Sequence, residues 1–206
     1  MDQKPARKNL SWLGLSAFFL GITAASKYVY CVIGVAVVIH LFINMLRKKI
    51  SPASISLLFA WGGVALLTFF IFNPYLWPHP IERLVRSLMY HVNYPMSNNV
   101  KQYNYPFWQT FLWLATPFST FFPLTRSSFV IRMDLVISLL ALAGIPRLFR
   151  HHQLFFIWLM TGLIILLVWQ TKWPQYTLII MVPFCFSAAE GARWLYNLVL
   201  SRRSLL

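Results

Sequence analysis

Acidic side chains are scarce in this chain of 206 residues, which has four of them against eighteen lysines and arginines and a formal net charge of +14. Charged residues of both signs make up 11% of the chain, less than half of the roughly 25% typical of a soluble domain. A nucleic-acid-binding domain gathers its basic residues on one water-facing patch, whereas here the charges lie between long apolar runs. The composition therefore excludes a soluble globular enzyme, a disordered tail and a nucleic-acid partner, and it predicts a polytopic membrane protein.

Cysteine is equally rare. Cys31 and Cys185 both lie inside apolar runs, and the chain contains no CxxC pair and no Cys–His cluster. We therefore interpret both cysteines as small apolar residues rather than as a disulfide. The sequence also gives no support for a zinc or iron–sulfur site.

Long hydrophobic runs, in contrast, dominate the chain, and 59% of its residues are hydrophobic. A helix needs about 17–25 mostly apolar residues to cross a bilayer core, and an open strand would leave its backbone polar groups unpaired there. We predict an all-α polytopic membrane protein, with residues 1–206 as a single membrane domain of about six spans. The spans are expected near residues 10–26, 28–46, 55–72, 129–145, 154–171 and 176–200.

Basic residues set the expected orientation, because cytoplasmic loops carry an excess of lysine and arginine. With the N-terminus inside, ten basic residues lie at cytoplasmic ends, seven lie outside, and Arg193 is within the last span. Six spans then place both termini in the cytoplasm and residues 73–128 in an outer loop. Residues 106–123 of that loop are apolar but carry three prolines and seven aromatic residues, so we predict an interfacial or re-entrant segment.

The outer loop also contains an amphipathic pattern. Six apolar residues between Ile81 and Val92 recur at helical spacing, while Arg83 and Arg86 fall on the opposite face. This pattern predicts a helix that lies on the outer membrane surface. Its arginines either anchor the helix to lipid phosphates or line a site for an anionic ligand, since arginine binds phosphate through two parallel hydrogen bonds.

Two lysines are predicted at the same outer boundary: Lys27 at the tip of the first hairpin and Lys172 in the turn between the last two spans. A lysine at this depth either extends to the interface or meets an anion. Extension to the interface explains either lysine alone. The two lysines form a lipid-phosphate pocket with Arg83 and Arg86 if the fold brings all four together.

The last predicted span contains one acidic and one basic residue, Glu190 and Arg193. They are three positions apart, so they can neutralise each other on one face of a helix. Small residues surround them, which allows close helix packing. We interpret the pair as structural, and we interpret His151 and His152 in the preceding turn as polar loop residues.

Three motifs follow one another along the chain: the hairpin GLSAFFLGITAASKYVY, the loop MYHVNYPMSNNVKQYNYPFWQTF and the turn TKWPQYTLIIMVPFCFSAAEG. In their order and spacing they resemble the C-terminal portion of GT-C superfamily membrane glycosyltransferases. The most similar branch is that of protein O-mannosyltransferases and aminoarabinose lipid A transferases. The resemblance extends over about residues 10–195.

The resemblance implies transfer of a sugar from a polyprenyl or dolichyl phosphate donor on the periplasmic or lumenal side. It implies that Lys172 and Tyr176 meet the lipid phosphate and that Lys27 corresponds to the basic hairpin tip. His91 corresponds to a loop histidine near the metal or the phosphate. The cofactor stays unknown, with a divalent metal as one option and His91 as its candidate ligand.

The sequence also departs from this family. A general base must take the proton from the attacking acceptor, but the family's catalytic carboxylate precedes everything in this chain, and Glu82 is the only carboxylate of the outer loop. Tyr90 and Tyr94 stand where the bacterial branch has a glutamate and an arginine. We therefore assign no catalytic residue and expect an incomplete enzyme, as a gene fragment, a split subunit or a degenerate copy.

The alternative is a non-catalytic membrane scaffold or lipid-binding subunit of a larger complex. In either case the expected partners are membrane lipids, the lipid-linked sugar donor, and a separate N-terminal half or partner membrane subunit. The expected location is the bacterial inner membrane, or the ER membrane in a eukaryote.

Overall fold

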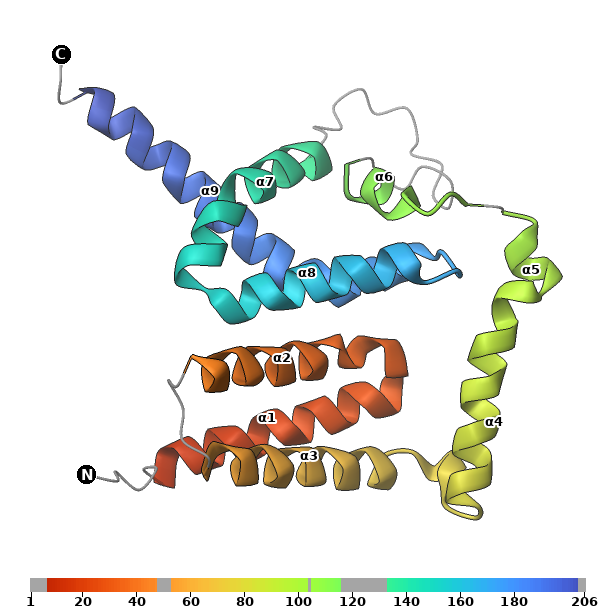
Figure 1. Cartoon of the computed structure of the whole chain (residues 1–206). Helices are drawn as coiled ribbons and strands as arrows, with labels where there is room; N and C mark the ends of the chain where they lie inside the picture. Colours follow the sequence, from red (N-terminus) through yellow and green to blue (C-terminus); the bar gives the residue numbers. More distant parts are fainter. Residues whose placement is uncertain (1–6, 48–52, 104, 116–132, 204–206) are drawn as a thin grey trace. The chain divides into compact units, whose positions relative to one another are not determined.

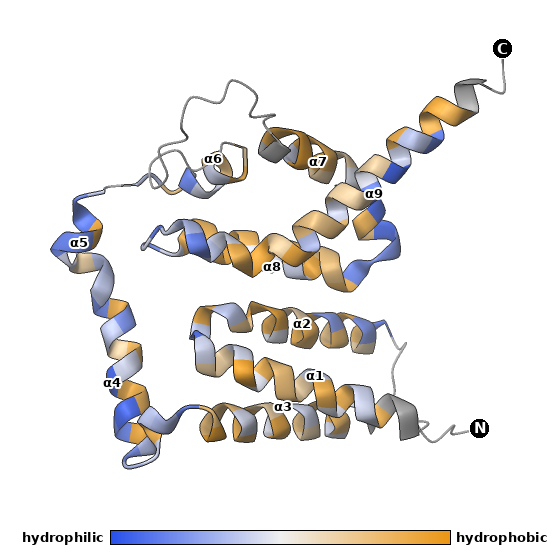
Figure 2. Cartoon of the chain, turned by 180° about the vertical axis from the view of Figure 1, so that it is seen from behind, coloured by the Kyte–Doolittle hydropathy of each residue, from blue (hydrophilic) through white to orange (hydrophobic). Residues whose placement is uncertain are grey.

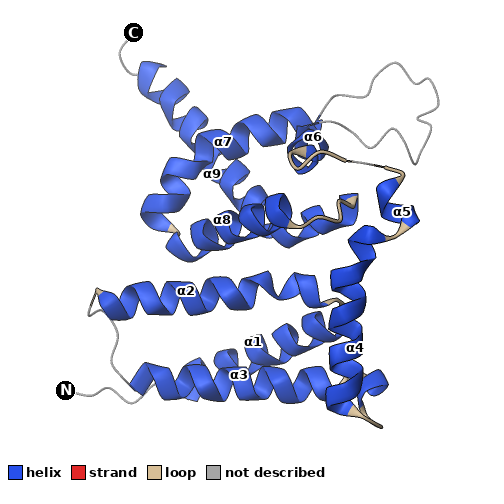
Figure 3. Cartoon of the chain, turned by 45° about the vertical axis from the view of Figure 1, so that its right-hand side comes forward, coloured by secondary structure: helices blue, strands red, loops and turns tan. Residues whose placement is uncertain are grey.

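The computed structural model describes residues 7–47, 53–103, 105–115 and 133–203. Within these ranges the chain consists of α-helices and short 3-10 turns, without a strand (Figure 3). The all-α class predicted from the hydrophobic runs is therefore confirmed. The chain divides into two compact units, Met1–Ser97 and Asn98–Leu206, which are described separately.

The first unit begins with the predicted helical hairpin (Figure 1). Lys27 ends its first helix, because the backbone of this residue is extended, with φ −164° and ψ 121°. The chain then turns through a short 3-10 segment into the second helix, and a third helix packs along the first. These elements are α1 (Arg7–Ser26), η1 (Tyr28–Cys31), α2 (Val32–Leu46) and α3 (Ala53–Ile71).

The contact between α1 and α3 depends on a glycine. A Cβ atom at Gly21 would lie 2.4 Å from the carbonyl oxygen of Ala65 and 2.5 Å from Cβ of Thr68. Without that atom the two helix backbones approach closely, as is typical of helix pairs that pack without a large side chain between them. Nearby, the indole N–H of Trp61 donates a hydrogen bond of 3.0 Å to Oγ of Ser16.

The first unit ends with the amphipathic helix predicted in the loop after α3. After the turn η2 (Pro74–Leu76), α4 (Pro80–Asn93) runs across the ends of the three preceding helices in Figures 1 and 3, and η3 (Tyr94–Met96) follows it. Pro80 and Glu82 lie in its first turn, where a fixed φ and a negative charge both stabilise a helix. Its apolar side chains are exposed, Ile81 by 81%, and Figure 2 shows polar and apolar positions alternating along the helix.

The second unit contains two short helices followed by three long ones. α7 and α9 cross closely, and α8 packs against α9. The indole N–H of Trp158 on α8 donates a 2.8 Å hydrogen bond to the carbonyl of Ile179 on α9. The elements are α5 (Asn98–Lys101), α6 (Gln109–Ala115), α7 (Met133–His151), α8 (Gln153–Val168), η4 (Pro174–Thr177) and α9 (Leu178–Arg203).

Three of the described helical segments are long and apolar enough to cross a membrane: Tyr28–Leu46, Ser54–Ile71 and Pro174–Leu200. Two further apolar stretches, Leu10–Ser26 and Gln153–Val168, are shorter. The structure therefore gives three candidate spans where the hydrophobic runs predicted six. The remaining expected span falls on α7, which begins at Met133, and residues 116–132 before it lie outside the described ranges.

The segment predicted to be interfacial or re-entrant is described only in part. Gln109–Ala115 forms the short helix α6, and residues 116–123 lie outside the described ranges. Large apolar side chains on the longer helices point outward, with exposed fractions of 76% for Phe59 and 63% for Leu142. Such surfaces suit hydrocarbon surroundings and are compatible with a membrane protein.

The crossing of α7 and α9 confirms the close packing predicted from the small residues around Glu190. A Cβ atom at Gly144 would lie 1.8 Å from the carbonyl oxygen of Ser187, and one at Gly191 would lie 1.9 Å from that of Leu140. The hydroxyl of Ser187, which is fully buried, donates a 2.7 Å hydrogen bond to the carbonyl of Ala141. The backbones of α7 and α9 are therefore in direct contact at this crossing.

We expect Gly144→Ala to lower the free energy of unfolding by about 1–3 kcal/mol, because backbone atoms cannot yield as a flexible side chain can. Thermal unfolding of the protein in detergent measures the effect. Gly14→Ala in α1 is the control, since a Cβ there meets nothing within 4 Å and alanine favours a helix over glycine by about 1 kcal/mol. Equal destabilisation by the two substitutions would contradict the proposed crossing.

Candidate lipid-phosphate site

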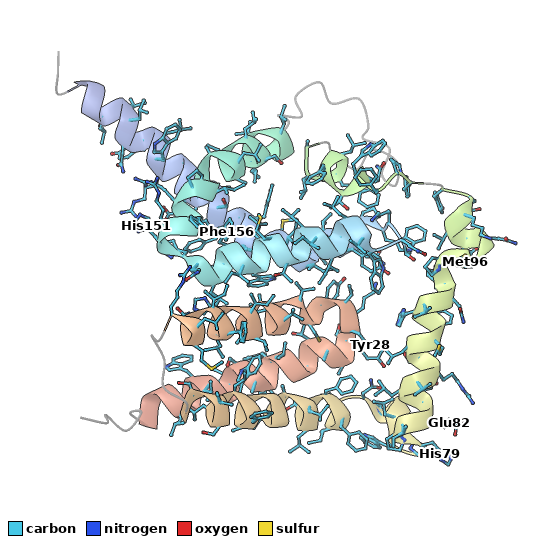
Figure 4. The ribbon with its side chains drawn as sticks, in the orientation of Figure 1. Tyr28, His79, Glu82, Met96, His151 and Phe156 are labelled. Carbon is cyan, nitrogen blue, oxygen red and sulfur yellow. The ribbon has the colours of Figure 1, made fainter. Side chains whose placement is uncertain are left out.

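The hairpin tip and α4 meet through aromatic rings in the first unit. The ring of Tyr28 lies 5.8 Å from the ring of His91, edge to face, and 5.8 Å from that of Phe69 at the end of α3. Figure 4 labels Tyr28 on the side of the hairpin that faces α4. Since Lys27 immediately precedes Tyr28, the fold brings two of the predicted site residues, Lys27 and His91, to the same end of the unit.

Lys27 is only half-buried. Its Nζ lies 5.9 Å from the centre of the Tyr30 ring, within the range of a cation–π contact. Partial burial lowers the pKa of the Lys27 ammonium from the ordinary lysine value. An anion close to this ammonium would favour the charged form again, so the hairpin tip is a position where a phosphate gains from a nearby cation.

The two arginines of the predicted site lie near the start of α4. Nη1 of Arg83 donates a 2.7 Å hydrogen bond to the carbonyl of Tyr75, and its guanidinium lies 5.1 Å from the centre of the Tyr75 ring. Nη2 of Arg86 donates a 2.8 Å hydrogen bond to Glu82, in a pair whose side chains are 70% and 62% exposed. Such exposed pairs contribute little free energy, so Arg86 can exchange its partner for a phosphate.

Spacing along α4 separates the arginines from the hairpin tip. Arg83 and His91 are eight positions apart, which at 1.5 Å per residue corresponds to about 12 Å. The first unit thus provides two basic regions. Arg83 and Arg86 form one of them on α4, and Lys27 at the hairpin tip forms the other, near His91 at the far end of α4.

The other two predicted residues, Lys172 and Tyr176, belong to the second unit. The predicted site residues therefore fall into two groups in the structure, with Lys27, Arg83, Arg86 and His91 in the first unit. Tyr176 is buried, and its ring lies 6.5 Å from that of Trp169, edge to face. Lys172 lies in the turn after α8 and Tyr176 lies in η4, and their contact with a lipid phosphate stays a prediction.

Lys172 caps a helix. Its side chain is buried, the residue being 7% exposed, and Nζ donates hydrogen bonds to the carbonyls of Leu166, Leu167 and Trp169, the second at 3.0 Å. The last carbonyls of a helix have no partner within it and attract a cation. An ammonium has three N–H groups, so these carbonyls use all of them. Burial lowers the pKa of Lys172 from the ordinary lysine value.

Sequence reasoning missed an aromatic cluster beside this cap. The rings of Tyr103 and Tyr105 are stacked at 5.6 Å, Tyr103 also meets Trp173 at 5.2 Å, and Tyr105 meets Trp113 at 5.4 Å. Only the richness in aromatic residues between 103 and 113 signalled it, because Trp173 is about seventy positions away. Tyrosine and tryptophan concentrate where hydrocarbon meets water, so this cluster suits an interfacial position.

Both carboxylates whose side chains the structure describes have cationic neighbours. Glu82 pairs with Arg86, and Glu190 lies 3.7–3.9 Å from Arg193, Arg147 and His152. The sequence interpretation recognised Arg193 only, because the other two lie about forty residues away. The side chains of the other two carboxylates, Asp2 and Asp134, lie outside the described part of the chain.

The described residues contain no group of three or more His, Cys, Asp or Glu side chains that could hold a metal ion. His91 contacts the rings of Tyr28 and Tyr90, and its role as a metal ligand stays a prediction. Comparison with protein-family models, with curated proteins and with solved structures finds no match to this chain.

We expect Lys172→Met to lower the free energy of unfolding by about 1.5–3 kcal/mol, because it leaves the end of α8 without its charged donor. Methionine keeps the apolar stem, so the change isolates the ammonium. Chemical unfolding in detergent measures the effect, with Lys101→Met at an exposed position of the same unit as the control. Unchanged stability together with weaker phosphate binding would instead show that Lys172 serves as a ligand.

Proposed function

We propose that this chain is an integral membrane protein that provides the lipid-carrier-binding part of a GT-C-type glycosyltransferase, without the catalytic base. Its ligand is the phosphate of a polyprenyl or dolichyl carrier, held on the periplasmic or lumenal side. The observation that supports this proposal is the contact of Tyr28 with His91, which joins the basic hairpin tip to the helix that carries Arg83 and Arg86.

The arrangement of charges and apolar surface in the first unit suits such a ligand. α3 is a candidate span, and α4 follows it after eight residues, with an exposed apolar face that includes Ile81 and Val92. A helix of this kind binds at the interface of a membrane with its apolar face buried. Arg86 then lies at the level of the headgroups, where a guanidinium pairs with a lipid phosphate through two hydrogen bonds.

The proposed topology places both termini in the cytoplasm of a bacterium, with the chain in the inner membrane, or in the cytosol of a eukaryote, with the chain in the ER membrane. It rests on the distribution of basic residues. α8 separates the His151–His152 turn from Lys172, and its sixteen residues correspond to about 24 Å. In this topology that turn is cytoplasmic and Lys172 is on the outer side.

A second candidate function is a non-catalytic lipid-binding subunit of a larger membrane complex. Both described carboxylates have cationic neighbours, and this observation favours a role without proton transfer. Both candidate functions bind a lipid phosphate. They differ in the partner, which is the rest of a glycosyltransferase in the first and a larger membrane complex in the second. A transfer assay with a membrane fraction that contains candidate N-terminal partners distinguishes them, because only the glycosyltransferase part restores sugar transfer.

For the carrier site, we expect Arg83→Ala combined with Arg86→Ala to weaken binding of a polyprenyl phosphate by about a hundredfold or more, since hydrogen bonds to charged groups contribute ~1.5–3 kcal/mol each. Native mass spectrometry of the purified protein in detergent measures the bound lipid. Lys101→Ala removes an exposed basic residue elsewhere and is expected to bind normally. Wild-type affinity in the double variant would reject the site.

For the topology, we expect a reporter fused after Tyr103 to be active outside the cytoplasm and a reporter fused after Arg150 to be active inside. A pair of alkaline phosphatase and green fluorescent protein fusions at each position gives opposite signals, so each fusion is the control of the other. The same side for both positions would contradict the proposed orientation.

A further inference from the structure

Charged side chains from three helices or their ends converge in the second unit. We call the set formed by Arg147, Arg150, His152, Glu190 and Arg193 the Glu190 cluster. The carboxylate of Glu190 lies 3.8 Å from Nη1 of Arg147, 3.7 Å from Nε2 of His152 and 3.9 Å from Nη1 of Arg193. Arg150 lies one helical turn after Arg147 on α7, on the same side of the helix.

The charges of this cluster do not balance. Two arginines, Arg147 and Arg193, lie within 4 Å of one carboxylate, and Arg150 follows one turn along α7, so the three arginines exceed the carboxylate by two positive charges. The distances from Glu190 also exceed the 2.7–2.9 Å of a charge-assisted hydrogen bond. Glu190 therefore does not use the guanidinium N–H groups fully. The side chain of Arg193 is 70% exposed, that of Glu190 only 13%, so the positive groups form the outer surface of the cluster.

The start of α8 adds to the positive potential. His152 is the residue before the first turn of α8 and makes no capping hydrogen bond from its side chain. The N-terminal end of a helix carries about half a positive charge and directs backbone N–H groups outward, which favours an anion. α8 has sixteen residues, so its dipole is well developed. This end of the helix thus faces the same region as the arginines.

The apolar residues near the cluster indicate where it lies relative to a membrane. α8 is apolar from Gln153 onward, and α9 exposes Trp194 and Tyr196 directly after Arg193. Tryptophan and tyrosine occupy the boundary between hydrocarbon and water. The cluster lies at the start of α8 and in the C-terminal half of the candidate span Pro174–Leu200, next to Trp194 and Tyr196, and hence near the cytoplasmic boundary in the proposed topology. His151, labelled in Figure 4, marks this end of the unit.

We propose that the Glu190 cluster binds a phosphate group, with Arg147, Arg150 and Arg193 as ligands and with Glu190 as a negative charge that competes with the phosphate for Arg147 and Arg193. The group belongs to an anionic phospholipid or is free phosphate, because the same guanidinium chemistry recognises both. Basic pockets between membrane helices bind anionic headgroups in this way. The site is independent of the carrier site proposed above, since the two share no residue.

The test uses the purified full-length chain in detergent, with phosphatidylglycerol as the anionic probe and phosphatidylcholine as the neutral one. Native mass spectrometry measures how much of each lipid stays bound. We expect Arg150→Ala combined with Arg193→Ala to weaken phosphatidylglycerol binding about 25-fold, which is about fivefold for each arginine. Phosphatidylcholine binding stays unchanged. Both side chains are exposed, so the variant is expected to fold.

A second variant tests the same site in the opposite direction. Glu190→Gln removes the only negative charge of the cluster, so we expect tighter phosphatidylglycerol binding by about three- to tenfold. A structural ion pair alone predicts no gain in lipid binding from this change. Lys101→Ala, an exposed basic residue of the same unit, is the control and is expected to bind the lipid like the wild type.

Competition with inorganic phosphate distinguishes the two sources of the ligand. Displacement of phosphatidylglycerol by millimolar phosphate supports the site with free phosphate as its ligand, and retention of the lipid supports it with a headgroup as its ligand. Wild-type phosphatidylglycerol binding in the double arginine variant overturns the proposal. An equal loss in Lys101→Ala, or a loss in folded Glu190→Gln, overturns it as well.

Discussion

The absence of side chains at Gly144 and Gly191 is the constraint on which the second unit depends. A single carbon at either position would occupy the space of a backbone carbonyl on the facing helix. Because α7 and α9 approach this closely, Glu190, which precedes Gly191, comes beside Arg147, which follows Gly144 by three residues. The same close packing of α7 and α9 therefore also brings these charged side chains together. In hydrocarbon, where apolar side chains gain nothing by leaving the solvent, such backbone contacts are the main source of association.

Much of the fold could be predicted from the sequence, because helices in apolar surroundings depend on local composition. The hairpin with Lys27 at its tip and the amphipathic helix α4 follow from the spacing of apolar residues over one or two turns. The number of spans is less certain from composition, since the apolar stretches Leu10–Ser26 and Gln153–Val168 are shorter than the three candidate spans. Hydropathy therefore predicts that a helix forms more reliably than it predicts whether the helix is long enough to cross a membrane.

The surroundings of individual charges could not be predicted in the same way. The contact of Lys172 with a lipid phosphate stays a prediction, and the spacing gave no sign that its ammonium reaches back to carbonyls three to six residues earlier. Nothing in the spacing distinguishes a lysine that turns back from one that extends outward, because the difference lies in its rotamers. The partners of Glu190 are hidden for another reason: Arg147 and His152 lie on other elements, and only the α7–α9 crossing brings them near.

The length of α9 has a consequence for the membrane around it. Its 26 residues correspond to about 39 Å, whereas the hydrocarbon core of a bilayer measures about 30 Å. A spanning helix that is longer than the bilayer core tilts, or the lipids around it extend to match its length. The depth of Arg193 then varies with bilayer thickness.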